Sequence, residues 1–199
     1  MTRLINRSGG ITYHYFASRF VSSLWLPYRA QVELWLNHWA VPSENPLILI
    51  GPSGGYSLPS HWLTRFQNIT VLEPDSLAKY LLQKRFPQIQ FQFPKIKTLQ
   101  NTLEFCQANP THTLLFTNLL GQIRHLTANS QEVLSIQNQV KPLLTRKHWA
   151  SYHDIFSVRT PQSLHEIRPF STTGRPTLED IICTTLTEIP HNVEFIDHE

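Results

Sequence analysis

The fold is decided by the stretch Asn45–Pro87, which reads NPLILIGPSGGYSLPSHWLTRFQNITVLEPDSLAKYLLQKRFP. Its four large apolar residues Leu47 to Ile50 predict a strand buried on both faces. This strand ends at a glycine-rich turn, Gly51 to Gly55, and a helical pattern follows. A second apolar run, Ile69 to Leu72, ends at the acid Glu73. The order of strand, glycine turn, helix, strand and acid is typical of a β-α-β unit that binds nucleotides at the carboxyl ends of its strands.

The alternation of helix and strand continues along the rest of the chain. The expected helices are 76–86, 99–107, 129–145 and 178–186, and the expected strands are 89–93, 113–117, 151–158 and 193–196. In the first of these helices, Leu77, Tyr80 and Leu81 should form the apolar face, with Asp75 or Ser76 as the cap. The alternation predicts an α/β fold: a Rossmann-like, mostly parallel, doubly wound sheet with helices on both faces.

An aromatic segment, residues 11–40, precedes the first strand. Its spacing predicts two helices divided by Pro27. We therefore expect an N-terminal helical extension over residues 1–44 and an α/β domain over residues 45–199, short or truncated at its carboxyl end. The aromatic helices could pack on the sheet as a plain layer, cover the site as a lid, or form a homodimer surface.

Composition limits the class of protein. The chain has 199 residues, a formal net charge of +3 and 16% charged residues, which gives no strong signal for nucleic acid. No stretch approaches the roughly 20 apolar residues that cross a bilayer, and no histidine pair has the spacing of a metal site. The two cysteines, Cys106 and Cys183, favour buried thiols in a reducing compartment. We expect a cytoplasmic protein without a metal.

Three polar features follow the predicted strands. Glycine and serine follow the first strand at Gly51, Ser53, Gly54 and Gly55; acids follow the second at Glu73 and Asp75; and a polar turn, 118–122, follows the fourth. Glu73 lies 18 positions after Gly55, close to the roughly 20 that separate such a loop from a ribose-binding acid. The pattern resembles the class I S-adenosylmethionine-dependent methyltransferases over about residues 45–160.

The resemblance implies S-adenosylmethionine as cofactor, with a small molecule or a protein as methyl acceptor. The cofactor-binding residues that it implies are Gly51, Ser53, Gly54, Gly55, Tyr56, Glu73, Asp75, Asn118 and Leu119. The catalytic residues stay unknown. Asn118 is one candidate, and His153 with Asp154 could form a general base and the group that orients it.

Each of these residues also has a structural interpretation. The glycines could form a tight turn without a ligand, Glu73 or Asp75 could cap the next helix, Tyr56 could lie on the surface, and Asn118 could belong to a simple turn. His153 and Asp154 are neighbours, so on a strand only one could face a pocket.

Two other functions remain open. The family often has acids where this chain has Leu49 and the segment 94–97, and Pro52 alters its usual loop spacing. These departures leave open a catalytically silent, methyltransferase-like binding module. An NAD-dependent oxidoreductase is a further alternative, although the glycine intervals differ from Gly-x-Gly-x-x-Gly.

Overall fold

The computed structural model describes residues 10–23, 25–117, 119–120, 130–152, 156–159 and 194–197. The chain divides into two compact units, residues 1–153 and residues 154–199. Each unit is described by itself. The boundary expected from the sequence, between residues 44 and 45, stays a prediction.

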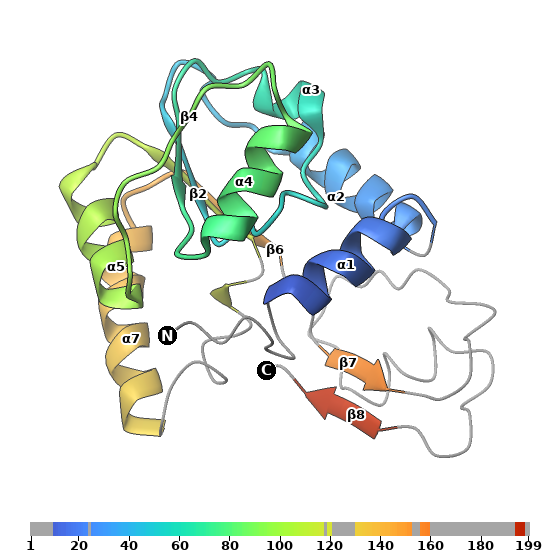
Figure 1. Ribbon diagram of the computed structural model, residues 1–199. Coiled ribbons are helices and arrows are strands. Elements are labelled where there is room, and N and C mark those ends of the chain that lie inside the picture. Colours follow the sequence, from blue (N-terminus) through green and yellow to red (C-terminus); the bar gives the residue numbers. More distant parts are fainter. Residues whose placement is uncertain are drawn as a thin grey trace. The chain divides into compact units, whose positions relative to one another are not determined.

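The first unit is built on a five-stranded sheet (Figure 1). Its strands are β2 (Leu47–Ile50), β3 (Ile69–Leu72), β4 (Phe91–Gln92), β5 (Thr113–Thr117) and β6 (Trp149–Tyr152). Every neighbouring pair is parallel, and the spatial order is β4-β3-β2-β5-β6. The chain runs outward from β2 to β4, returns to β5 beside β2, and then runs outward to β6. The predicted doubly wound, Rossmann-like sheet is confirmed, with its switch point between β2 and β5.

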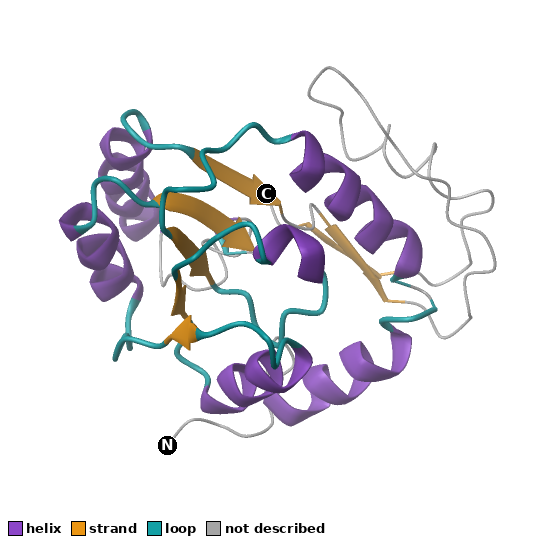
Figure 2. Cartoon of the chain, turned by 90° about the horizontal axis from the view of Figure 1, so that it is seen from above, coloured by secondary structure: helices purple, strands orange, loops and turns teal. Residues whose placement is uncertain are grey.

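Helices cover both faces of this sheet (Figure 2). They are α1 (Gly10–Phe20), α2 (Leu26–His38), α3 (Ser60–Leu63), α4 (Ser76–Arg85), α5 (Leu99–Ala108) and α7 (Ser130–Leu144). Alternate residues of β2 face opposite sides. Leu47 and Leu49 belong to a core cluster with residues of α2, α3 and α4, whereas Ile48 and Ile50 belong to a cluster with residues of α5 and α7.

Each of these two layers contains a fully buried side chain with distinctive chemistry, Trp62 in one and Cys106 in the other. In the α2–α4 layer, Trp62 is fully buried; its ring stacks on Trp39 at 6.0 Å and meets Phe66 at a tilt at 4.9 Å, measured between ring centroids. In the α5–α7 layer, Cys106 is fully buried, and burial raises the pKa of its thiol to about 12. These two side chains lie on opposite faces of the sheet.

The strands at the centre match the sequence prediction. All residues of β2, β3 and β5 are buried, as continuous apolar runs in a parallel sheet predict. The short strand β4 lies at an edge, as expected from its alternating sequence. The two N-terminal helices are also confirmed as α1 and α2. Pro27 lies in the first turn of α2, where its missing N–H costs nothing.

The predicted strand 151–158 is wrong. In the structure β6 ends at Tyr152, and β7 (Phe156–Arg159) pairs with β8 (Glu194–Asp197) in a separate antiparallel sheet of two strands. The described β6 is exposed at Trp149 and buried at Ala150. A terminal strand of the sheet needs no continuous apolar run, so the sequence does not mark its start.

Two further predictions concern helices. Tyr80 was expected on the apolar face of α4, but it is 62% exposed, and the buried residues are Ala78 and Leu82. The helix turns this pair inward because Leu82 packs with Phe86 in the α2–α4 layer. The predicted helix 178–186 lies outside the described residues.

Within the part of the chain that the structure describes, no helix has the length and apolar character needed to cross a membrane.

Candidate functional site

The glycine loop follows the central strand at the switch point of the sheet. Three of its residues have left-handed backbone conformations: Gly51 (φ 67°), Ser53 (φ 51°) and Gly55 (φ 68°). Glycine adopts such angles without strain, whereas Ser53 does so at a cost. The chain therefore leaves β2 through a sharply folded turn at the carboxyl edge of the sheet, where ligands bind in this architecture.

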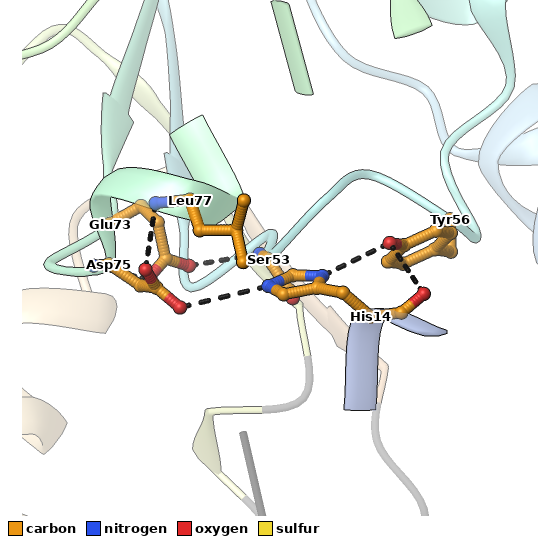
Figure 3. Close-up of polar contacts among 6 residues, drawn as sticks. All are labelled: His14, Ser53, Tyr56, Glu73, Asp75 and Leu77. Carbon is orange, nitrogen blue, oxygen red and sulfur yellow. Dashed lines mark hydrogen bonds and ion pairs between the residues drawn. The ribbon is translucent and has the colours of Figure 1, made fainter. Parts of the chain in front are cut away.

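Glu73 ties this loop to the turn after β3 (Figure 3). One carboxylate oxygen accepts a hydrogen bond from the Ser53 backbone N–H (2.9 Å), and the other accepts one from the Asp75 backbone N–H (3.0 Å). The residue is 7% exposed. Burial raises the pKa of Glu73, and the two N–H donors only partly offset this effect. The carboxylate therefore already stabilises the loop within the protein.

Asp75 caps α4. Its Oδ1 atom accepts a hydrogen bond from the Leu77 backbone N–H at 2.8 Å, so the predicted helix cap is confirmed. Its Oδ2 atom lies 3.7 Å from Nε2 of His14, a buried residue of α1. Asp75 thus serves the helix and faces the N-terminal extension at the same time.

Tyr56 is a buried residue, so the alternative interpretation that it lies on the surface is wrong. It is 4% exposed, and its ring contacts the rings of Tyr13 and Trp25 edge-on. Its hydroxyl lies 3.0 Å from Nδ1 of His14, and the Arg85 guanidinium carbon lies 4.5 Å from its ring centroid. The ring is therefore enclosed by residues of the N-terminal extension and of α4.

The glycines of the loop differ in what surrounds them. A Cβ atom on Gly54 would lie 2.7 Å from the Tyr56 ring, and one on Gly55 would lie 2.5 Å from Cδ1 of Leu82. A Cβ atom on Gly51 would lie 3.5 Å from both Cβ of Leu119 and the Thr117 carbonyl oxygen, an ordinary contact. Close packing thus explains Gly54, the backbone angle explains Gly51, and both explain Gly55.

The end of β5 lies against the same loop. Thr117 is buried and donates a hydrogen bond from its hydroxyl to the Ile50 carbonyl (3.0 Å), and Leu119 lies beside Gly51. Asn118, His153 and Asp154 lie outside the described residues.

Sequence reasoning missed three contributors to this site: His14, Arg85 and Tyr152. The Arg85 Nε–H donates to the Gly54 carbonyl (3.1 Å), and the Tyr152 hydroxyl lies 2.9 Å from the Ser57 hydroxyl. These partners are 31 and 95 positions apart in the sequence, so no local pattern could pair them. One feature of the sequence could have indicated His14. It lies three positions before the small residue Ala17, so both residues lie on the same face of α1, which is buried.

The described residues contain no group of three or more histidine, cysteine, aspartate or glutamate side chains placed to hold a metal ion. Two shallow cavities border the opposite edge of the sheet, one beside Pro110 and Lys147 and the other beside Gln67 and Gln88. Both lie near the amino ends of the strands and do not include the glycine loop.

No protein-family model matches the chain, and no curated protein sequence matches it either. Among solved structures, it is similar to that of a DhpI–SAH complex, with 14% identity and a TM-score of 0.48, covering 76% of this chain and 72% of that one. It is also similar to DszA carbon methyltransferase, with 17% identity and a TM-score of 0.30, covering 75% of this chain and 36% of that one. The assignment of the fold rests on the strand order of the chain itself.

Proposed function

We propose that this chain is an S-adenosylmethionine-dependent methyltransferase that acts on a small molecule or a protein. One observation carries the proposal: the glycine loop at the switch point is joined directly to the acid that follows the neighbouring strand. The Ser53 N–H and the Glu73 carboxylate make this connection at 2.9 Å. It brings together the two elements that an adenosyl ligand needs in a doubly wound sheet.

The residues of the site would share the work of binding. Gly51 offers backbone approach at the end of β2, and Glu73 would accept the hydroxyls of a ribose. Each carboxylate oxygen has two lone pairs, so the bonds to Ser53 and Asp75 leave acceptor capacity. The cofactor would supply an activated methyl group. The chain would then contribute mainly by aligning the acceptor and excluding water, which needs no general base when the acceptor is already nucleophilic.

A silent binding module is the second candidate, and a specific observation favours it. Both Glu73 oxygens already bond to backbone N–H groups, and the space beside Gly54 and Gly55 holds Tyr56 and Leu82. A loop held in this way is stable without a ligand. In this hypothesis the fold presents a surface to a partner and transfers no group.

Calorimetry with S-adenosylmethionine, S-adenosylhomocysteine and NAD separates these functions. Binding of the first two and not of NAD supports the methyltransferase. Glu73→Ala should then weaken the affinity by about one to two orders of magnitude, because a hydrogen bond to a charged group contributes about 1.5–3 kcal/mol. Glu104→Ala, which removes an exposed glutamate of α5 bonded to Gln100, is the matched control. The absence of binding by all three ligands would favour the silent module, and binding of NAD alone would favour the oxidoreductase.

Two expectations about the wider context complete the proposal. The protein would act in the cytoplasm, and it would form a homodimer through exposed aromatic residues of its first two helices. Tyr15 and Phe16 of α1 are 56% and 50% exposed, and Trp35 of α2 is 39% exposed. Light scattering should then give twice the chain mass of 23.1 kDa. A mass equal to one chain would exclude the dimer.

A further inference from the structure

The buried residue His14 of helix α1 makes polar contacts with the candidate site. His14 contacts the glycine loop through Nδ1, which lies 3.0 Å from the Tyr56 hydroxyl. It contacts the start of α4 through Nε2, which lies 3.7 Å from Oδ2 of Asp75. Figure 3 shows the imidazole between these two partners. One side chain thus bridges the loop after β2 and the turn after β3.

The Tyr56 hydroxyl also donates a hydrogen bond to the His14 backbone carbonyl (3.3 Å), which does not titrate, and two further contacts between α1 and the loop are apolar. Ala17 and Val21 follow His14 at helical spacing, and both are buried in a cluster with Tyr56. These apolar side chains do not titrate, so their contacts do not depend on pH. The dependence of this contact on pH therefore falls on His14.

We propose that α1 is a latch on the glycine loop, and that protonation of His14 releases it. The inference rests on the proposed function only in taking this loop as part of the ligand site. With the latch closed, Tyr56 and Asp75 hold the loop and the α4 terminus in one arrangement. With the latch open, the loop loses its contact with the N-terminal extension.

The charges around His14 set the direction of the effect. Asp75 faces it from the start of α4, Tyr56 from the loop, and Glu73 lies behind Asp75 with its carboxylate bound to backbone. Two cations lie further out: Arg85 is over the Tyr56 ring, and Arg29 donates to the carbonyl of Val21 at the end of α1. Among the described neighbours, Asp75 favours the imidazolium, and the buried position disfavours it.

Burial is the larger effect, and it lowers the pKa of His14 below its ordinary value of 6.5 although Asp75 acts in the opposite direction. The closed state therefore binds a proton less readily than an open state in which the imidazole reaches water. The free energy that favours the closed state is fully present above the ordinary pKa of histidine. It is lost as the pH falls through the lowered pKa that His14 has in the closed state. Acid should open the latch.

Hydrogen exchange of the full chain tests whether acid releases α1 from the glycine loop. Protection factors would be measured for peptides over residues 10–23, 52–58 and 74–82 between about pH 7.5 and about pH 5.5, where histidine changes charge. We expect protection of these peptides to fall several-fold at the acid end in the wild type. His14→Gln keeps a polar group that can reach Asp75 but does not titrate, so its protection should not change with pH.

Two more variants complete the design. His14→Phe keeps an aromatic ring and loses both contacts of the imidazole, whereas the backbone carbonyl of residue 14 still accepts from the Tyr56 hydroxyl, so the loop should be less protected at every pH. The control is His61→Gln, because His61 on α3 also lies near a carboxylate, with Nδ1 3.4 Å from Glu33, but at an exposed position. This control should keep the pH dependence of the wild type.

The latch is overturned if His14→Gln retains the wild-type pH dependence. It is also overturned if the strands β2 and β5 lose protection by the same factor as the loop, since the change would then be global unfolding. Calorimetry with S-adenosylhomocysteine at the same pH values tests the proposed function separately. If hydrogen exchange shows the latch but S-adenosylhomocysteine does not bind, only the proposed function is refuted. If S-adenosylhomocysteine binds, acid should weaken its affinity for the wild type and not for His14→Gln.

Discussion

The two carboxylate oxygens of Asp75 have different partners, so their contributions can be separated. Oδ1 caps α4 through the Leu77 N–H, and Oδ2 faces His14. Asp75→Ala removes both contacts and should destabilise the protein by about 1 kcal/mol or more, as lost caps do. Asp75→Asn keeps an equally good cap and removes the charge, so most of the stability should remain. Urea denaturation near neutral pH measures both variants, and equal losses would contradict this separation of roles.

The glycine loop permits a second comparison between single residues. Gly51→Ala should cost about 1–2 kcal/mol, the strain of a left-handed backbone, because its new Cβ meets only ordinary contacts. Gly55→Ala has the same strain and also places Cβ 2.5 Å from Leu82 and 2.8 Å from Phe86. This overpacking should add about 1–3 kcal/mol. Thermal unfolding of the two variants should show the larger loss for Gly55→Ala; the reverse order would show that the loop can move away from α4.

At the scale of elements, the one-turn helix α3 contributes the fully buried ring of Trp62 to the α2–α4 layer. Trp62→Ala should cost about 3–5 kcal/mol, since it removes a fully buried indole. The Trp62 Nε1 donor is buried and has no hydrogen-bond partner among the described residues. Trp62→Phe removes this unsatisfied donor, which itself costs about 1–3 kcal/mol, so its net loss should be much smaller. Denaturant titration of both variants would contradict this account if their losses were equal.

The elements also show which parts of the fold could be predicted from sequence. The strands β2, β3 and β5 were predictable because a strand buried on both faces forms a short, mostly apolar run, which only threonines interrupt in β3 and β5. The strand β6 was misplaced because Trp149 is exposed and no apolar run marks it. The face of α4 was misjudged at Tyr80, because the side of a helix that meets the sheet depends on packing partners distant in the sequence, such as those of Leu82.

At the scale of the whole molecule, the topology was predictable and the interior of the site was not. Alternating helices and strands allow few arrangements, so the doubly wound order followed. The position of Glu73 after β3 was also correct. Its bond to Ser53 and the contact between His14 and Tyr56 join residues 20 and 42 positions apart. Such contacts depend on side-chain packing, which a single sequence does not show.

The division into two units leads to a prediction for the whole chain. Residues 1–153 form a compact unit that contains the complete five-stranded sheet. A chain ending at residue 153 should therefore unfold cooperatively in urea and keep its helix and strand signals in circular dichroism. The two strands β7 and β8 alone should not fold, since an isolated two-stranded sheet is marginal in water. A gradual, non-cooperative transition of the 1–153 chain would contradict this.

The placement of Trp62 and Cys106 on opposite faces of the sheet provides the molecule with two independent reporters. With Cys183 replaced by serine, a thiol reagent could reach Cys106 only when the α5–α7 layer opens, because the buried thiol with a pKa of about 12 is unreactive in place. Indole fluorescence, dominated by rings of the other layer, would report the α2–α4 side. The order in which the two layers separate during unfolding could thus be timed in a single sample.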